Sequence, residues 1–246
     1  MIDLTFTFPT RGRSHFLPAF FRNILETIGD PSRVEIIIQY DDDDTATQNV
    51  LQEQKKMHPS LPMVIIERER GANLSDHYFN WLVYNKVYRG KYMWVGGDDL
   101  RILTPNWDGI IIDAIEGYLS NKRDRICYAF PTDKSLNKPL RSFPWGWFPM
   151  MTRETIDTLG FFFPKEFGTW GADLVLADLF NSPKVQRSLP ITGVVVDHIG
   201  YHAYNMPKDE TARSMSQRFN STLNLSTAYR TQLMGFDKEK LHNAIR

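Results

Sequence analysis

The stretch Val34-Glu35-Ile36-Ile37-Ile38-Gln39-Tyr40, followed directly by Asp41-Asp42-Asp43-Asp44, decides the fold class of this chain. Its three consecutive isoleucines form a continuous β-branched run, which is typical of a strand buried on both faces of a parallel sheet. The four aspartates then end the strand abruptly. We therefore expect a buried parallel strand here, with an acidic loop at its carboxyl end.

Apolar runs and helical patterns alternate on both sides of this stretch. Strands are expected over residues 4–8, 63–66, 92–95 and 126–130, and helices over residues 17–28, 45–57, 79–86 and 107–118. A capping box of Thr45 and Gln48 would open the second helix, and a cap at Asn73 or Ser75 the third. This alternation predicts βαβ units, and hence an α/β chain with a mostly parallel central sheet flanked by helices.

Beyond residue 130 the alternation stops. An aromatic and proline-rich stretch covers residues 143–149, and it is followed by expected helices over residues 153–159 and 173–180 and a strand over residues 192–196. Residues 205–246 have a loop-like and helical pattern, with 7 Lys or Arg against 4 Asp or Glu. The sequence therefore predicts one α/β unit with a helical C-terminal extension.

The charge balance limits the classes of partner. The 246 residues carry 29 Lys plus Arg and 29 Asp plus Glu, so the formal net charge is zero. Binding to nucleic acid or anionic membranes through a general electrostatic field needs surplus positive charge, so binding of that kind is not expected, and nucleic acid is not an expected partner. No apolar run reaches the roughly 18 residues of a transmembrane helix, and residues 1–5 do not resemble a signal peptide. The single cysteine, Cys127, cannot form an internal disulfide, and we expect a cytoplasmic protein.

Several common catalytic motifs are absent from the sequence. The turn after the first strand lacks a G-x-G-x-x-G pattern, and no G-x-x-x-x-G-K-[ST] loop occurs. There is also no G-x-S-x-G nucleophile elbow, no H-E-x-x-H motif and no pair of C-x-x-C motifs. These absences argue against dinucleotide oxidoreductases, P-loop enzymes, α/β-hydrolases and zinc proteins.

Charged residues follow the expected strands, where ligands of open parallel sheets bind. Asp98 and Asp99 stand on a Gly-Gly turn, and adjacent carboxylates suit Mg²⁺ or Mn²⁺, although both could be ordinary turn residues. In the run after the second strand, Asp41 is the better functional candidate and Asp42 the next. The alternative for Asp43 and Asp44 is a solvated turn with a helix cap.

Together these residues resemble a GT-A fold glycosyltransferase, and within that class the nucleotide-sugar-dependent family 2, over residues 3–200. In that family the first strand ends in a proline and a loop that touches the nucleotide, and the second in an acid that contacts the base or ribose. A further loop packs against the nucleoside, and a D-x-D motif binds the metal. The matching residues here are Pro9, Thr10 and Arg11; Asp41 or Asp42; Arg70 and Asn73; and Gly97, Asp98 and Asp99. Gly97 stands where a strict motif has its first aspartate.

The most specific match is the stretch from Leu159 to Leu174, which resembles the "G-x-F-D-E-x-F … G-W-x-E-D-x-D-L" signature of the family. The resemblance assigns the catalytic base to Asp173, with Ala172 in place of the usual glutamate. It also implies a late histidine at the metal, which is either His198 or His202. Trp145 and Trp170 are candidate platforms for acceptor sugar rings.

The resemblance implies transfer of a hexosyl or deoxyhexosyl group from a nucleoside diphosphate, with UDP the expected nucleotide, to a hydroxyl of a carbohydrate or glycan acceptor. The cofactor would be Mn²⁺ or Mg²⁺, held by Asp99 and a histidine, and one base at Asp173 implies inversion. Residues 1–204 would form the catalytic domain, with a nucleotide-binding half over residues 1–100 and an acceptor half over residues 101–204. The extension over residues 205–246 could cover the acceptor site, mediate a homo-oligomer or touch a membrane.

Three other interpretations use some of the same residues. A sugar nucleotidyltransferase shares the α/β architecture and the metal, but usually has a Gly-rich basic loop after the first strand, where this chain has only Gly12. A carbohydrate-binding module could use the aromatic residues without catalysis. A glycoside hydrolase needs two carboxyl groups flanking the bond and no nucleotide.

Overall fold

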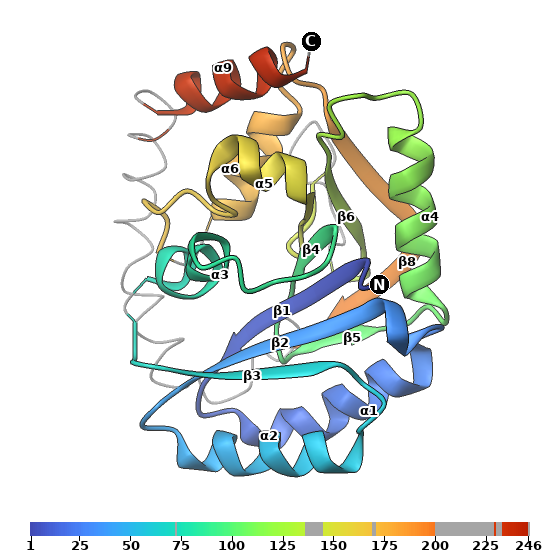
Figure 1. Cartoon of the computed structure of the whole chain (residues 1–246), viewed down its shortest axis with the longest axis vertical. Coiled ribbons are helices and arrows are strands. Elements are labelled where there is room, and N and C mark those ends of the chain that lie inside the picture. The colour runs from blue at the N-terminus through green and yellow to red at the C-terminus, as the bar shows by residue number, and fades with distance from the viewer. Residues whose placement is uncertain (72, 136–144, 169–170, 200–228, 230–232, 246) are drawn as a thin grey trace.

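One mixed sheet organises the chain. The computed structural model describes residues 1–71, 73–135, 145–168, 171–199, 229 and 233–245, and their strands form an eight-stranded sheet in the order β3-β2-β1-β4-β7-β6-β8-β5. The strands are β1 (Leu4–Thr10), β2 (Val34–Asp41), β3 (Met63–Arg68), β4 (Tyr92–Val95), β5 (Leu100–Ile102), β6 (Tyr128–Asp133), β7 (Met150–Thr152) and β8 (Ser188–His198). Figure 1 shows the sheet with helices packed around it.

The first half of the sheet is parallel, as the sequence predicts. β1 pairs with β2 on one side and β4 on the other, and β3 extends the sheet beyond β2. Every residue of β2 is buried, in agreement with its continuous apolar run. The carboxyl ends of these strands therefore lie along one edge, which is where the charged loops emerge.

The second half is mixed. β7 runs antiparallel to both β4 and β6, while β8 is parallel to β6 and antiparallel to β5. The predicted strands at residues 126–130 and 192–196 correspond to β6 and β8. The three-residue strands β5 and β7 were not predicted, because so short a segment carries no readable alternation.

Two apolar cores lie on opposite faces of the sheet. Along β4, Tyr92 and Trp94 pack into one core, whereas Met93 and Val95 pack into the other. This alternation follows from the two-residue period of a strand. Each of these residues is buried, so β4 is covered on both sides.

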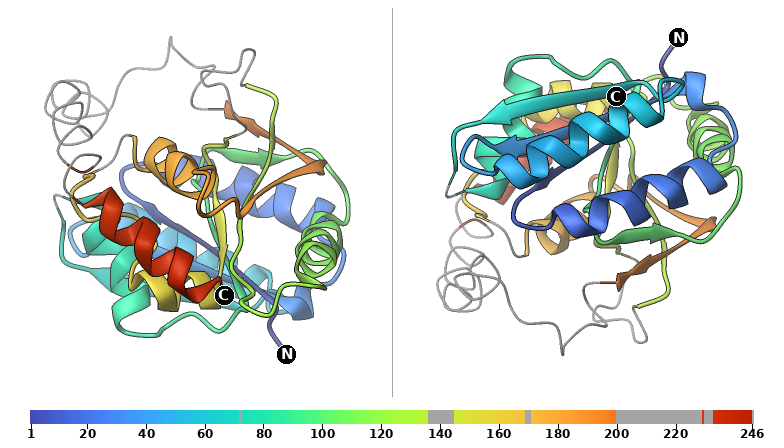
Figure 2. Two further views of the ribbon diagram at one scale, coloured as in Figure 1. Left: turned by 90° about the horizontal axis from the view of Figure 1, so that it is seen from above. Right: turned by 90° about the horizontal axis from the view of Figure 1, so that it is seen from below.

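The helices divide between these cores. The first core takes α1 (Leu17–Thr27), α2 (Thr45–Met57) and α4 (Trp107–Leu119). The second takes α3 (Trp81–Tyr84), α5 (Arg153–Leu159), α6 (Ala172–Phe180) and α9 (Met234–Ala244). Figures 1 and 2 show the two groups of helices lying apart. Among the helices of the described residues, none combines the length and apolar character needed to cross a bilayer.

Two helix starts differ in detail from the prediction. The cap of α2 is Asp44, whose Oδ1 accepts a hydrogen bond from the Thr47 amide at 3.1 Å, rather than Thr45 in a capping box. Asn73 does act as a cap, but the segment it opens is a π-helical stretch, η3 (Leu74–Asn80), that runs into α3. The predicted C-terminal helix is present as α9, where Met234 and Leu241 enter the second core. Residues 200–228 and 230–232 of the expected extension lie outside the described residues.

Candidate active site

The end of β1 lies beside the turn after β4. We call residues 96–99, which contain Asp98 and Asp99, the acidic turn. Thr10 at the end of β1 donates a hydrogen bond from Oγ1 to Asp98 Oδ2 at 2.7 Å. Pro9 precedes it in the same strand. Because β1 and β4 are neighbouring parallel strands, the residues that follow β4 lie beside the end of β1.

The Gly-Gly turn after β4 has little space for side chains. A Cβ placed on Gly96 would lie 2.3 Å from the buried ring of Phe6, and one placed on Gly97 would lie 2.7 Å from Asp99 Oδ1. The two acids that follow are buried, with Asp98 4% and Asp99 8% exposed. Glycine at both positions therefore lets the chain turn tightly while both carboxylates stay at the strand end.

Arg13 connects the two acids. Its Nη1 lies 2.8 Å from Asp98 Oδ1, and its Nη2 lies 2.8 Å from Asp99 Oδ2. His198 Nε2 lies 3.5 Å from the same Oδ2 of Asp99. Burial alone would raise the pKa of Asp99, but His198 and Arg13 outweigh it and hold the pKa below its usual range.

His198 reaches the acidic turn through the pairing of β8 with β5. In that pairing His198 lies opposite Leu100, and the Ile199 amide donates to the carbonyl of Asp99 at 2.9 Å. The rings of Trp147 and Phe148 each meet the imidazole edge-on, with centroids 5.0 Å away. The imidazole is therefore fixed between an aromatic wall and the acids.

The donor atoms at this turn suit a divalent cation. Two carboxylates and an imidazole are ligands that Mn²⁺ accepts, and Mg²⁺ accepts the carboxylates. Among the residues that the structure describes, no three His, Cys, Asp or Glu side chains converge into a complete metal cage. A cation here would consequently take its remaining ligands from a bound phosphate or from water.

A second group of polar contacts surrounds the end of β2. Asp41 is 2% exposed, and its carboxylate accepts hydrogen bonds from Arg11 Nη1 at 3.0 Å and from the Tyr78 hydroxyl. Burial, followed by this hydrogen bond to Asp41, raises the pKa of Tyr78 to about 12. Asp42 is exposed, and its amide donates to the Arg68 carbonyl at 2.7 Å. Of the two alternatives, Asp41 is thus the one whose carboxylate lies within the contact network.

The remaining aspartates of the run have separate partners. Asp43 accepts a hydrogen bond from Arg11 Nη2 at 2.8 Å, while Asp44 accepts one from the Gly12 amide at 2.6 Å and caps α2. Gly12 has a φ of +65°. This left-handed turn separates the two arginines, so that Arg11 pairs with the acids after β2 and Arg13 with those after β4.

The loop after β3 contacts the segment that precedes α6. Asn73 Nδ2 donates to the Lys165 carbonyl at 2.7 Å, and the Leu74 amide donates to the Gly168 carbonyl at 2.6 Å. Arg70 is exposed on the same loop. The hydrogen bond from Arg11 lowers the pKa of Asp43, and the charge of Arg70 adds a smaller contribution.

Asp173 is the second residue of α6, which begins directly after Gly171. The φ of Gly171 is +85°. The side chain is half-buried, and its charge adds to burial in raising the pKa of the Tyr128 hydroxyl. Trp145 is 8% exposed, with its ring centroid 6.1 Å from that of Trp147. The candidates Trp170 and His202 lie outside the described residues.

Arg13 and Tyr78 were not predicted as site residues. Arg13 lies in the loop after the first strand, but only the turn at Gly12 determines which acids it meets. Tyr78 directly precedes the predicted helix over residues 79–86, where an aromatic side chain is more often a sign of core packing. Arg13 follows the predicted residue Arg11 closely, which is a weak signal, whereas Tyr78 is 37 positions from Asp41 and carries no such signal.

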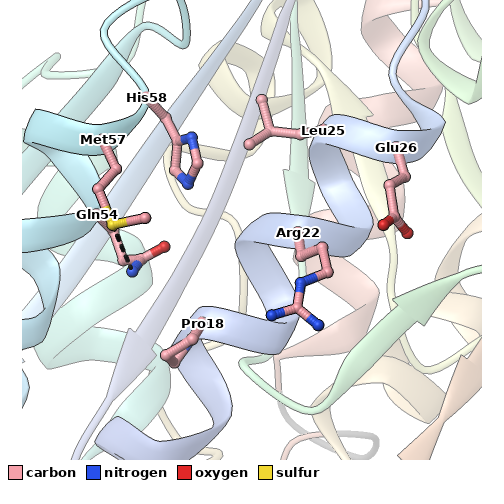
Figure 3. A pocket seen from close by; sticks show the side chains of 7 residues that line it. All are labelled: Pro18, Arg22, Leu25, Glu26, Gln54, Met57 and His58. Carbon is pink, nitrogen blue, oxygen red and sulfur yellow. Dashed lines mark hydrogen bonds between the residues drawn. The ribbon is translucent and has the colours of Figure 1, made fainter.

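A surface pocket of about 280 Å³ lies elsewhere, between α1 and the end of α2 (Figure 3). Its lining side chains are Pro18, Arg22, Leu25, Glu26, Gln54, Met57 and His58. It contains no pair of neighbouring carboxylates and none of the predicted site residues. We therefore place the candidate active site at the strand ends and not in this pocket.

Comparison with solved structures identifies related architectures. No protein-family model matches the sequence, and no curated protein matches it. A mannosyltransferase, PcManGT from Pyrobaculum calidifontis in complex with GDP-Man and Mn²⁺, superposes with a TM-score of 0.62 at 15% identity, covering 98% of this chain and 73% of that one. S. aureus TarS 1-349 in complex with UDP-GlcNAc superposes with a TM-score of 0.58 at 12% identity, covering 99% of this chain and 79% of that one.

GalNAc-T7 with UDP, GalNAc and Mn²⁺ gives a TM-score of 0.57 at 14% identity, covering 80% of this chain. The chain spans 43% of that GalNAc-T7 chain and 36% of a longer TarS chain. At such low identities the likeness concerns the course of the backbone and not the side chains. With its strand-end acids and its mixed sheet, this chain has the GT-A fold.

Proposed function

We propose that this chain is a metal-dependent glycosyltransferase that moves a sugar from a nucleoside diphosphate, UDP in the first instance, to a hydroxyl of a carbohydrate acceptor. The observation that carries this proposal is the convergence of two acidic groups at one sheet edge. Asp41 with Arg11 lies at the end of β2, and Asp98 with Asp99 lies after β4, with β1 between them.

In this proposal the nucleoside occupies the end of β2. Asp41 contacts the base or ribose, since its carboxylate is already oriented by Arg11 and Tyr78. Pro9 and Thr10 shape the floor beneath the nucleotide, and Arg70 and Asn73 flank it from the loop after β3. Solved structures with this fold carry UDP, UDP-GlcNAc or GDP-Man, which supports a nucleotide at this edge.

The diphosphate lies next to the turn after β4. Asp99 and His198 would hold the divalent cation, with Asp98 beside them and Gly97 leaving room for the phosphates. A bound cation stabilises the negative charge that develops on the leaving diphosphate without any proton transfer. The Mn²⁺ in the complexes of PcManGT and GalNAc-T7 supports this assignment.

The acceptor hydroxyl needs a base, because an alcohol is a weak nucleophile. Asp173 is the proposed base: it takes the hydroxyl proton while the oxygen forms its bond to the anomeric carbon and the diphosphate departs. One base opposite the leaving group gives inversion of configuration. The contacts of Asn73 and Leu74 with residues 165–168 support a position of α6 close to the nucleotide loop.

The acceptor sugar would stack on Trp145 and Trp170. Trp145 is 8% exposed and its ring lies near that of Trp147, so little of it is available to a ligand. It therefore serves as a wall of the acceptor site, and we assign the larger contact to Trp170.

The test is sugar release from a panel of UDP- and GDP-sugars with Mn²⁺ and mixed glycan acceptors. We expect turnover by the wild type and loss of about 100-fold or more for Asp173→Asn, with donor binding retained, because only the proton acceptor is removed. Asp157→Asn, an exposed aspartate on α5, is the matched control. Wild-type turnover by Asp173→Asn would contradict the assignment of Asp173 as the base. Full turnover with excess chelator would contradict the requirement for a metal.

A further inference from the structure

The acidic turn already holds a positive charge of its own. The two terminal nitrogens of Arg13 each lie 2.8 Å from a different aspartate, so the guanidinium spans Asp98 and Asp99. Two neighbouring buried carboxylates repel each other and lose hydration, so one counter-charge shared between them stabilises both in ionised form.

This position of Arg13 is defined by several contacts. Thr10 fixes the far oxygen of Asp98 at 2.7 Å, and the guanidinium carbon of Arg13 lies 4.9 Å from the centroid of the Phe16 ring. The guanidinium is thus held between an aromatic ring and the acids. Counting side-chain atoms alone, Arg13 is 28% exposed, whereas Asp98 is 2% and Asp99 11% exposed. Of these three side chains, Arg13 is therefore the most exposed to solvent.

A cation that bridged the two carboxylate oxygens held by Arg13 would need the place that the guanidinium fills. Asp99 Oδ2 is 2.8 Å from Arg13 Nη2, so a cation that bound this oxygen from the same side would lie next to the guanidinium. The two positive groups would also repel each other strongly at such a separation.

We propose that Arg13 is a built-in competitor of the divalent cation: it occupies the acidic turn when no ligand is bound, and it moves aside when the cation enters together with the nucleotide. This inference rests on the proposed metal site. On leaving the acids, the guanidinium remains at the same sheet end, where the donor phosphates can accept its hydrogen bonds. Phosphate binding would therefore offset the displacement of Arg13, and it would couple the binding of nucleotide and cation.

The experiment is calorimetric titration with Mn²⁺ alone, without nucleotide, on the full chain. Wild-type protein should bind Mn²⁺ weakly, and Arg13→Gln should bind it roughly 10-fold or more tightly, because each hydrogen bond between charged groups that no longer has to be broken is worth a factor of this size. Arg13→Lys keeps the charge but cannot span both acids with two nitrogens, so we expect an intermediate affinity.

Arg11→Gln is the matched control. It removes the same charge from the same loop, but its partners are Asp41 and Asp43. We expect only a small gain in Mn²⁺ affinity, since no direct contact with the acidic turn is lost and the remaining effect is screened by salt. Adding Asp99→Asn to Arg13→Gln should abolish the gain, which would locate the bound Mn²⁺ at the turn.

The possible results separate the two proposals. Equal or weaker Mn²⁺ binding by Arg13→Gln, in protein that still binds UDP with Mn²⁺, would overturn the role of Arg13 and leave the proposed function standing. No binding of Mn²⁺ by any variant, with or without UDP, would contradict the metal site and with it this inference. Thermal unfolding of each variant confirms that it is folded, and Arg13→Lys provides the same comparison should Arg13→Gln fail to fold.

Discussion

His198 Nε2 lies 3.5 Å from Asp99 Oδ2, because β8, the last strand in chain order, pairs with β5, the short strand that follows the acidic turn. The turn after β4 thus receives one side chain from β8, which lies towards the other end of the sheet. This relationship predicts that removing either partner changes the same binding event, which is entry of the divalent cation.

We expect Asp99→Asn to weaken Mn²⁺-dependent binding of UDP about 100-fold or more, because a charged ligand is lost. His198→Ala should weaken it less, by about 10-fold, since a neutral imidazole contributes no net charge. Calorimetry with UDP at saturating Mn²⁺ measures both. Asp197→Asn, at the neighbouring position of β8, is the control, and an effect as large as that of His198→Ala would argue that β8 is merely disturbed.

The two glycines of the turn should behave differently when each is replaced by alanine. Gly96→Ala places a Cβ 2.3 Å from the buried ring of Phe6, so the core must shift, which costs about 1–3 kcal/mol of unfolding free energy. Gly97→Ala meets only Asp99 Oδ1, at 2.7 Å, so we expect near-normal stability but weaker Mn²⁺ affinity as the carboxylate moves. Urea unfolding and Mn²⁺ titration separate the two effects. Equal loss of stability in both variants would contradict this account of the turn.

Asp41 and Asp42 should be separable by their effect on nucleoside binding. Asp41→Asn removes a buried charge that Arg11 and Tyr78 contact, and we expect UDP affinity to fall about 10-fold or more, because hydrogen bonds to charged groups are worth roughly 1.5–3 kcal/mol. Asp42→Asn, at an exposed side chain, should leave UDP binding within twofold or so of wild type. If Asp42→Asn lost more UDP affinity than Asp41→Asn, Asp42 would be the residue that contacts the nucleoside.

Asp44 gives a prediction about pH. Burial by itself would raise the pKa of Asp44, but hydrogen bonds from the Gly12 amide and from Thr47 stabilise its ionised form and lower the pKa. A lowered folded-state pKa means that the stabilisation is complete above about pH 5, where the unfolded aspartate is also ionised, and is lost as the pH falls through the folded-state value.

Replacing this cap by alanine should therefore cost about 1 kcal/mol near pH 7, and the difference from wild type should shrink towards pH 3. Urea unfolding of wild type and Asp44→Ala across this range provides the measurement. Asp42→Ala, which removes an exposed carboxylate of the same run, should show little effect at any pH. A difference that stays constant from pH 7 to pH 3 would be inconsistent with a cap that acts through its charge.

Much of the fold could be predicted, because its central strands are long and apolar. The isoleucine run of β2 specifies a strand buried on both faces, and the helix Arg153–Leu159 has the bounds that its pattern predicts. β5 and β7 are not predicted, because three residues are too few to show the two-residue alternation of a strand. Their presence depends on pairing with β8 and with β4 and β6, which is information that no local stretch of sequence contains.

The site was predictable where function requires a residue type at a strand end, and less so where the backbone direction matters. Asp41 is the last residue of β2, and Asp99 lies in the turn after β4, so their place at the sheet edge could be inferred. Arg13 could not be assigned, because the left-handed turn at Gly12 sends it to other acids than Arg11. Similarly, Asp44 and Thr45 are both plausible caps, and the hydrogen bond from the Thr47 amide decides between them.

The most direct test of the central claim is a thermal-shift measurement with nucleoside diphosphates and Mn²⁺, each alone and together. A ligand that binds the folded state raises the unfolding temperature, so two ligands that share one site should raise it more together than the sum of their separate shifts. We predict this excess for UDP with Mn²⁺ in the wild type and its loss in Asp99→Asn. A shift with UDP that is the same with and without Mn²⁺, or an excess that persists in Asp99→Asn, would contradict a metal-assisted diphosphate site at the acidic turn.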